Sequence, residues 1–373
     1  APLPSVATEK QPATRVGIGL DEPIAVISMA CRFPGADTPE AFWQLLQAGA
    51  DLVGEVPASR WPVDEFYSAQ RPVPGKMYTR NAAFITGVEG FDPLFFGIAP
   101  REATSMDPHH RLLLEVTWEL LERAGIAAST LVDSQTGVFI GIGTSDYGAL
   151  SDTQDLTSLD TYTVTSSGNS AAAGRLAYTL GLQGPTMAVD TACSSSLVSL
   201  HLACQSLRTG ECELALAGGV SLMLSPLGHI ALSQIQSLAP DGRCKTFDAA
   251  ADGYGRGEGS GLVLLKRLRD AERAGDTVLA VIKGSAVNHD GPSSGLTVPN
   301  KRAQEKLIRQ ALANAAVTPD EVGYIEAHGT GTSLGDPIEI RALGAVFSAT
   351  RTQPLLVGSV KTNMGHLEQA AGI

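Results

Sequence analysis

The sequence predicts an α/β fold. From about residue 21 onward, apolar runs of strand length alternate with amphipathic helical patterns, an alternation typical of α/β proteins. Hydrophobic residues make up 43% of the 373-residue chain and charged residues 18%, so the chain can bury a large core and is not a disordered polymer. Residues 1–20 are rich in Pro, Ala and Thr and show neither the helical nor the alternating spacing of apolar residues. This predicts a linker or tail before one folded domain at 21–373.

The first elements follow from apolar runs and from residues that start and stop helices. In order, they are a strand at 24–30, a helix from Thr38 to Gly49, an amphipathic helix at 109–124 and a buried strand at 138–142.

The middle of the chain predicts a strand–turn–helix–strand unit. Residues 186–189 and 214–220 are apolar and of strand length, and residues 194–209 carry an apolar stripe at helical spacing. A small-residue turn separates the first strand from the helix.

The next elements are again strands and helices in alternation. Two strands at 262–265 and 278–282 flank a charged turn, a helix at 303–315 is capped by Asn300, and a strand follows at 322–327.

The final elements begin with the sequence DPIE at 336–339, which has the pattern of a capping box with proline at the first helical position. A strand at 355–360 follows, and a Gly/Ala-rich helical pattern begins near His366 shortly before the chain ends. Because domains rarely end within an element, the sequence is predicted to be a fragment of a longer polypeptide.

Charge and cysteine content exclude several classes of protein. The net charge of −12 gives no basic footprint for nucleic acid, and no apolar run is long enough to span a membrane. No signal peptide is visible at the N-terminus. The five cysteines are odd in number and lack the spacing of a zinc site, which indicates reduced thiols in a cytoplasmic protein, without a disulfide framework or a bound metal.

The motif DTACSSS at 190–196 is the sharpest local feature, because it joins a short apolar strand to an amphipathic helix. Cys193 lies where that helix begins, and the positive end of the helix dipole favours a nucleophilic thiolate there. The alternative is a buried structural cysteine. Because of the strand–turn–helix context, the sequence supports a nucleophilic cysteine and a structural cysteine equally before any partner is considered.

A nucleophilic cysteine needs a partner that manages protons or charge, and histidine is the usual one. His328 and His366 each follow a predicted strand, and ligands of open α/β sheets gather at the carboxyl ends of strands. Lys361, five residues before His366, either orients an imidazole or is an ordinary surface lysine. The remaining histidines are assigned to structure or solvent: His109 and His110 at the start of a helix, His201 within the helix after Cys193, and His229 and His289 in loops.

The glycine-rich stretch GYGRGEG at 253–259 does not have the spacing of a dinucleotide-binding fingerprint, and no Walker sequence occurs. Neither a nucleotide nor a phosphate site is therefore expected. These glycines are predicted to allow close backbone packing beside a pocket.

Together, these motifs give the sequence a resemblance to the β-ketoacyl synthase (ketosynthase) domain of type I polyketide synthases. The segments that carry it are EPIAV at 22–26, CRFPG at 31–35, MDP at 106–108, DTACSSS at 190–196, DGRCK at 241–245, EAHGTGT at 326–332 and KTNMGH at 361–366. The resemblance runs from about residue 21 to the end, where the domains of the family continue for several dozen residues that this sequence lacks.

The resemblance implies a thiolase-like fold of two similar βαβ-rich halves in five layers (αβαβα), usually as a homodimer. It implies that Cys193 takes an acyl chain as a thioester from the phosphopantetheine arm of an acyl carrier protein, and that no cofactor is bound by the domain itself. A malonyl-type extender then loses carbon dioxide and attacks that thioester in a Claisen condensation, within a cytoplasmic synthase of several domains. His328 and His366 would stabilise the enolate, and Lys361 would fix His366 or its surroundings.

Two other functions compete with chain elongation. A non-elongating ketosynthase-like module would relay acyl chains or serve as a dimerisation scaffold, and loss of Cys193, His328 or His366 would be its sign; all three are present. A Cys/His hydrolase needs only one histidine and leaves the second, with Lys361, unexplained.

An acidic domain that binds acidic carrier proteins needs a local basic patch. Two clusters are candidates for it, although solvated helix faces explain either equally well: Lys266, Arg267, Arg269 and Arg273, and Lys301, Arg302, Lys306 and Arg309.

Overall fold

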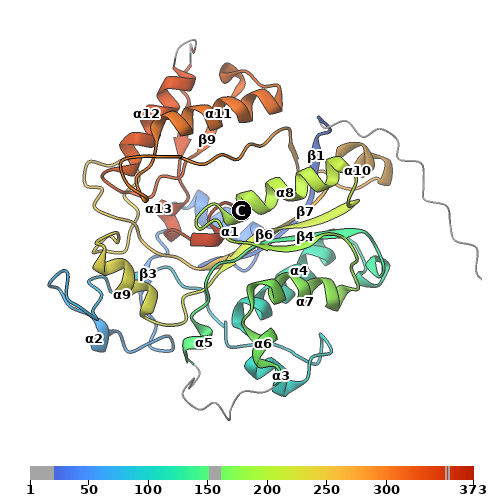
Figure 1. Ribbon diagram of the computed structural model, residues 1–373, viewed down its shortest axis with the longest axis horizontal. Helices are drawn as coiled ribbons and strands as arrows, with labels where there is room; N and C mark the ends of the chain where they lie inside the picture. The colour runs from blue at the N-terminus through green and yellow to red at the C-terminus, as the bar shows by residue number, and fades with distance from the viewer. Residues whose placement is uncertain (1–20, 151–160, 349–350, 352) are drawn as a thin grey trace, which may run out of the picture.

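The computed structural model describes residues 21–348 except 151–160, together with 351 and 353–373. Its main feature is a six-stranded mixed sheet with the order β5-β4-β6-β7-β1-β8 (Figure 1). The three strands β5, β4 and β6 run parallel, and β7, β1 and β8 pair with their neighbours antiparallel. These strands are β1 (Ile24–Arg32), β4 (Thr136–Gly141), β5 (Thr186–Val189), β6 (Leu214–Ser221), β7 (Gly259–Arg267) and β8 (Ala280–Ile282).

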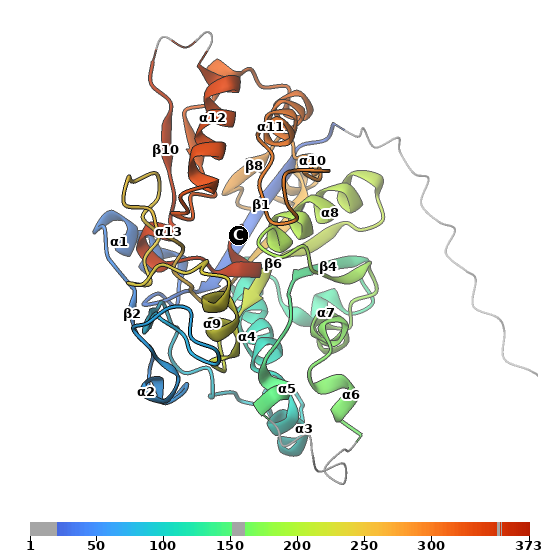
Figure 2. The same ribbon diagram turned by 60° about the vertical axis from the view of Figure 1, so that its left-hand side comes forward.

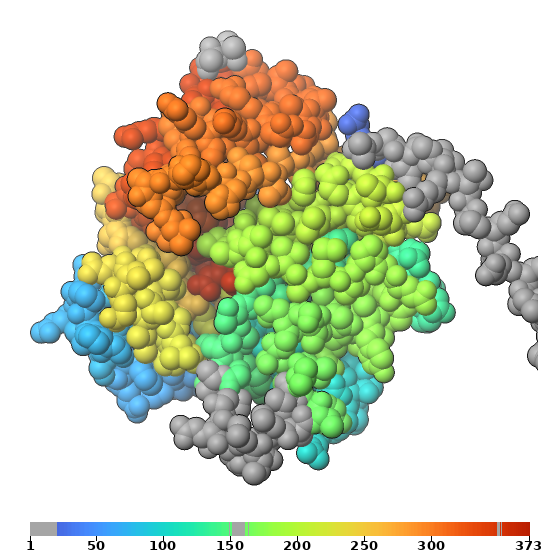
Figure 3. All heavy atoms as spheres, viewed as in Figure 1, coloured from blue at the N-terminus to red at the C-terminus, as the bar shows by residue number. Residues whose placement is uncertain are grey.

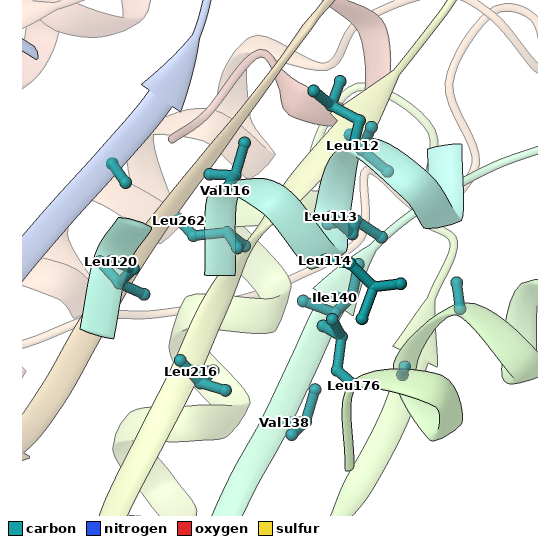
Figure 4. Close-up of a cluster of buried hydrophobic side chains, with 14 of the residues drawn as sticks. Leu112, Leu113, Leu114, Val116, Leu120, Val138, Ile140, Leu176, Leu216 and Leu262 are labelled. Atoms are coloured by element: carbon teal, nitrogen blue, oxygen red, sulfur yellow. The ribbon is translucent and has the colours of Figure 1, made fainter. Parts of the chain in front are cut away.

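Helices cover both faces of this sheet, because successive residues of each central strand point to opposite sides. On one face Ile140 and Leu216 pack under α4 and α7, in the core of which Figure 4 shows a part. On the other face Phe139 and Ala217 pack under α8. The helices are α4 (Pro108–Arg123), α7 (Asn169–Leu180) and α8 (Ser195–Thr209).

A second unit follows β8 in the chain and lies at the top of the views in Figures 1 and 2. Its strands β9 (Tyr324–Glu326) and β10 (Leu356–Gly358) are parallel, and α11 (Lys301–Ala315) and α12 (Gly335–Phe347) pack together beside them. Asn300 caps α11 by accepting from the N–H groups of Arg302 and Ala303, as the sequence predicts.

The remaining elements are short. They are the strands β2 (Gly54–Glu55) and β3 (Asn81–Ala82), the helices α1 (Pro39–Gln47), α2 (Val63–Phe66), α3 (Pro100–Ser105), α5 (Tyr147–Leu150), α6 (Thr163–Ser166), α9 (Leu227–Gln234), α10 (Leu268–Ala274) and α13 (Lys361–Met364), and the 3₁₀ turns Ala128–Leu131, Pro319–Glu321 and Glu368–Ala370.

The structure corrects three expectations. The charged turn expected between the strands at 262–265 and 278–282 is the helix α10, which Gly275 ends in a left-handed conformation. The DPIE sequence does not cap α12, because the helix begins one residue earlier, at Gly335, and its N-cap residue Leu334 makes no side-chain cap. His229 is not in a loop but is buried in α9.

The glycine-rich stretch packs closely against neighbouring backbone, as predicted. A Cβ at Gly255 would lie 1.8 Å from the carbonyl oxygen of Gly242, and one at Gly257 would lie 2.3 Å from that of Met364. The predicted linker at 1–20 lies outside the described residues, so the domain boundary at residue 21 stays a prediction.

Candidate active site

Cys193 lies in a tight elbow between the end of β5 and the start of α8. Ala192, just before it, has a φ of 54°, an uncommon left-handed conformation for a residue with a side chain. Hydroxyl groups hold this turn: Ser195 Oγ donates to the Ala192 carbonyl at 2.7 Å and accepts from the Thr191 N–H at 2.9 Å. The elbow therefore presents Cys193, the exposed one of the five free thiols, at a fixed position.

The thiol of Cys193 does not have the lowered pKa that the helix N-terminus predicts. Although the residue is exposed, the protein around it removes water, and this desolvation raises the pKa of the thiol above its ordinary value. The carboxylate of Glu368 raises the pKa further, whereas the ammonium of Lys361 lowers it. The helix terminus alone is thus insufficient to hold a thiolate, and Lys361 supplies part of the missing positive charge.

His328 follows β9 in the EAHGTGT loop, where a carboxylate from α12 fixes the backbone. Glu339 accepts from the N–H of His328 at 2.7 Å and from the N–H of Gly329 at 2.9 Å. Gly329 has a φ of 48° and would bring a Cβ to 2.5 Å from Thr246, so glycine is required at this position. The imidazole of His328 is neutral, because desolvation and the nearby Lys361 lower its pKa.

His366 is buried, and its ring lies perpendicular to that of His328 with 5.3 Å between the centroids. Its Nδ1 accepts from the backbone N–H of Glu368 at 3.1 Å, which places the ring proton on Nε2. That Nε2 has no partner among the described residues and is free to donate to a ligand. Burial, with His328 and cationic neighbours, holds the pKa of His366 well below its usual range, so the ring is neutral.

Lys361 begins α13, after β10, and is buried. Desolvation lowers the pKa of its ammonium, while the carboxylates of Glu326 and Glu339 and the thiols of Cys193 and Cys244 oppose this change. Lys361 therefore acts on Cys193, His328 and His366 through its charge.

Cys193, His328 and Lys361 follow the carboxyl ends of β5, β9 and β10, as the sequence analysis expects, whereas the short helix α13 separates His366 from β10. The segment after His366 closes the site against α8, because the N–H of Gly372 donates to Ser196 Oγ at 3.0 Å. In Figure 3 this C-terminal segment shows as a red patch at the bottom of a hollow between α8 and the orange second unit. The arrangement thus groups one thiol and two neutral imidazoles around the ammonium of Lys361.

Several residues of the site were missed from the sequence. Asp336 and Glu339 were interpreted as capping residues, yet both carboxylates accept from loop backbone, Asp336 from the N–H groups of Phe247 and Gly331 at 2.7 and 3.1 Å. Tyr254 packs edge-on against His366 with 5.5 Å between centroids. The GTGT loop could have indicated these two carboxylates, because its backbone N–H groups need hydrogen-bond acceptors and no helix or strand supplies them.

Replacement of Glu339 by glutamine is expected to loosen the His328 loop. The amide keeps one acceptor oxygen but loses the charge that binds two N–H groups, each such bond contributing about 1.5–3 kcal/mol. We expect the turnover of the site to fall by on the order of tenfold, since a misplaced reactive group is costly. The measurement is the turnover rate, with the melting temperature recorded in parallel.

The matched control is Glu321→Gln. Glu321 also accepts from a backbone N–H, that of Thr318 at 2.8 Å, but it precedes β9, whereas His328 follows this strand. Equal turnover in Glu339→Gln and in this control would show that the carboxylate does not position His328.

The remaining histidines lie outside this site, and those other than His110, whose buried ring nitrogens have no hydrogen-bond partner among the described residues, have structural partners. His109 Nδ1 lies 2.7 Å from an Asp107 carboxylate oxygen, and His201 Nδ1 lies 2.8 Å from Ser285 Oγ. His110 is buried on α4, and His289 accepts from the N–H of Gly291. Their assignment to structure agrees with these contacts.

Comparison with known proteins decides the family. Residues 21–271 match the family described as beta-ketoacyl synthase, N-terminal domain, and residues 279–373 match beta-ketoacyl synthase, C-terminal domain. The chain belongs to the β-ketoacyl synthase family. The resemblance that the motifs indicate is therefore confirmed.

The curated relatives of this ketosynthase chain are polyketide synthases. It is 54% identical over 356 residues to a phenolphthiocerol/phthiocerol polyketide synthase of Mycobacterium tuberculosis, a match that covers 94% of this chain and 19% of that protein. It is likewise 54% identical over 359 residues to polyketide synthase GfsB of Streptomyces halstedii, covering 95% of this chain and 6% of that protein.

Solved ketosynthase domains share the fold. The oxazolomycin ketosynthase domain of Streptomyces albus superposes with a TM-score of 0.90 at 44% identity, covering 94% of this chain and 61% of that one. The ketosynthase from module 6 of the bacillaene synthase of Bacillus subtilis gives 0.86 at 40% identity, with coverages of 94% and 59%. The predicted thiolase-like α/β fold is confirmed, and so is the predicted enzyme class, a β-ketoacyl synthase of the polyketide type. No helix in the described part of this ketosynthase is long and apolar enough to cross a bilayer.

Proposed function

We propose that this domain forms a carbon–carbon bond by decarboxylative Claisen condensation, on an acyl chain held as a thioester at Cys193. The observation that carries the proposal is the meeting of an exposed thiol with two neutral imidazoles, one of which has a free, buried N–H. A nucleophile and two neutral imidazoles grouped around Lys361 suit a reaction that first builds a thioester and then an enolate.

The first step is acyl transfer. The sulfur of Cys193 attacks the carbonyl of an acyl thioester on a phosphopantetheine arm, and the carrier thiol leaves with a proton. Lys361 favours the attacking thiolate, because its charge opposes the desolvation that raises the thiol pKa.

The second step consumes a malonyl-type extender. Its carboxylate leaves as carbon dioxide, and the bonding electrons form an enolate whose oxygen accepts hydrogen bonds from His328 and His366. The enolate carbon then attacks the Cys193 thioester, and the sulfur leaves as thiolate. Loss of carbon dioxide supplies the carbanion, so these steps need no metal or redox cofactor; substrates arrive on the carrier arm.

The test is to supply a carrier-bound acyl donor and a carrier-bound malonyl extender and to follow carbon dioxide and products by mass spectrometry. Elongation predicts one carbon dioxide released for each acyl chain lengthened by two carbons. Acyl transfer without carbon dioxide would instead establish the relay or scaffold function, and free fatty acid would establish hydrolysis. The presence of Cys193, His328 and His366 in one site favours elongation over both.

We propose that the carrier protein docks on the exposed face of α11. The cationic side chains of the first basic cluster, around Lys266, already form ion pairs. Lys266 pairs with Asp276, and both Arg267 and Arg273 pair with Asp270. By contrast Arg302 and Lys306 are exposed, and the described residues place no carboxylate within ion-pair distance of either.

Reversing the charge of Arg302 and Lys306 together is expected to slow acyl loading from a carrier-bound donor by on the order of tenfold, because complementary charge speeds association. Loading from a small cysteamine-linked donor should be unchanged, and raised salt should mimic the reversal. Loading is measured as acylated protein by intact mass.

The control pair is Arg269→Glu with Arg273→Glu, which makes the same change in net charge on the paired cluster. An equal loss with both donors, or the same loss in the control pair, would mean that α11 does not dock the carrier.

We propose that the domain is a homodimer and works beside other synthase domains. The outer edge of β5 has no strand partner in the described residues, and Met187 on this strand is 37% exposed. An unpaired edge of this kind is suited to pairing with the same strand of a second copy. The chain spans 19% of its M. tuberculosis relative, which supports a multidomain setting.

A further inference from the structure

Arg256, in the centre of the glycine-rich stretch, forms a two-pronged ion pair with Glu368. Its Nε lies 2.7 Å from Oε1 of Glu368 and its Nη2 lies 2.9 Å from Oε2. The Arg256 side chain is 8% exposed and that of Glu368 is 20% exposed. Paired contacts of a guanidinium with a carboxylate fix geometry as well as charge.

Glu368 is also the residue whose backbone N–H donates to Nδ1 of His366. Its φ of 49° lies in the left-handed region, where a residue with a side chain is held only if its surroundings require it. This conformation aims the N–H at the imidazole and thereby sets the proton on Nε2. The ion pair between the Glu368 carboxylate and the Arg256 guanidinium is the contact that can hold this backbone conformation.

The guanidinium itself is immobilised from the opposite side. Its Nη1 donates to Nδ1 of the buried His229 at 3.0 Å, and a Cβ at Gly228 would lie 2.6 Å from the same nitrogen. His229 in turn packs against Trp61 with 5.3 Å between ring centroids. Arg256 therefore cannot swing away from Glu368 without disturbing α9.

The backbone on either side of Arg256 holds His366 directly. The N–H of Gly257 donates to the His366 carbonyl at 2.8 Å, and the N–H of His366 donates to the Gly255 carbonyl at 2.7 Å. Side chain and backbone of one short stretch thus fix both ends of the segment from His366 to Glu368.

We propose that Arg256 and Glu368 are positioning residues that hold the backbone N–H of Glu368 on His366 Nδ1 and so keep the His366 Nε2–H directed at the developing enolate. Neither residue touches substrate in this assignment. The assignment rests on the proposed role of His366 in decarboxylation.

The test uses Glu368→Gln, Glu368→Gly and Arg256→Lys in the complete native polypeptide. Glycine keeps the backbone N–H and accepts a positive φ without strain, so it removes the side-chain clamp together with the negative charge that raises the pKa of Cys193. Lysine keeps the charge of Arg256 but cannot form the two-pronged pair. The matched control is Glu119→Gln, which breaks a similar pair with Arg32 far from Cys193 in the sheet.

Acyl loading of Cys193 counts the correctly folded molecules, and carbon dioxide release from a malonyl extender is expressed per loaded thiol. We expect all three variants to lower the kcat of decarboxylation by on the order of tenfold, with the KM for the extender and the extent of loading unchanged. The control should match the wild-type protein in every measurement.

Wild-type decarboxylation per loaded thiol in either Glu368 variant would overturn the proposal, and so would equal losses in loading and decarboxylation, which would show a folding role only. A wild-type protein that loads acyl groups but releases no carbon dioxide would overturn the proposed function itself, and this assignment with it.

Discussion

Replacement of Cys193 by alanine is expected to abolish acyl loading and to lower elongation by about a thousandfold or more, because the thioester intermediate can no longer form. The fold should persist, since the side chain is exposed at the elbow and supports no core. The measurement is intact mass after incubation with an acyl donor, followed by the rate of product formation.

Selective alkylation of the unmodified protein gives the same assignment independently. Cys193 is the exposed thiol, whereas Cys31, Cys204, Cys212 and Cys244 are buried. Burial raises the pKa of Cys244 and of Cys204 to about 11, which suppresses their thiolates. Cys193 should therefore be labelled first, and Cys31→Ser serves as the control that leaves loading intact. Faster labelling of Cys31 or Cys244, with Cys193 inert, would show that the nucleophile is wrongly assigned.

The sequence was sufficient for the parts of the fold that local patterns determine. Apolar runs and glycine stops located β5, α8 and β6, because burial and helix termination leave a mark within a few residues. The helices α7 and α9 were not predicted, and α10 was expected as a turn. The same local reasoning placed Cys193 and His328 just after strands, where the structure has them, whereas the short helix α13 separates His366 from β10.

The contacts that orient the site were not visible in the sequence, because they join residues far apart in the chain. The carboxylates of Asp336 and Glu339 have the spacing of a capping box, and nothing local distinguishes a helix cap from an acceptor for a distant loop. Arg256 and Glu368 are 112 residues apart, so their pairing required the fold. The raised pKa of Cys193 likewise comes from desolvation by segments that converge only in three dimensions.

Changing His328 or His366 to alanine is expected to separate the two half-reactions. Decarboxylative condensation should fall by on the order of a hundredfold or more in each variant, because in the proposed mechanism each imidazole donates a hydrogen bond where enolate charge develops. Acyl loading should fall far less, because no enolate forms in that step. Lys361→Ala should impair both steps, because the ammonium acts on the thiol as well as on the imidazoles.

The pH dependence follows from the direction of the histidine shifts. The donor role requires neutral rings, and both pKa values lie below the ordinary value of 6.5, so the neutral forms persist as the pH falls through 6.5. Decarboxylation per loaded thiol should thus stay level across this range and decline only as the pH passes through the lowered values. Loading should rise with pH toward the raised pKa of the Cys193 thiol.

The two half-reactions are measured on the same sample, as acylated Cys193 by intact mass and as carbon dioxide released from a malonyl extender. His201→Ala is the matched control, because it removes an imidazole from the helix that follows the nucleophile, where His201 contacts Ser285, while Cys193, His328 and His366 stay in place. Normal elongation in either active-site variant at unchanged loading would remove that histidine from the mechanism. Equal losses in loading and decarboxylation would instead mean that the imidazoles assist the acylation of Cys193. The enolate would then need another hydrogen-bond donor.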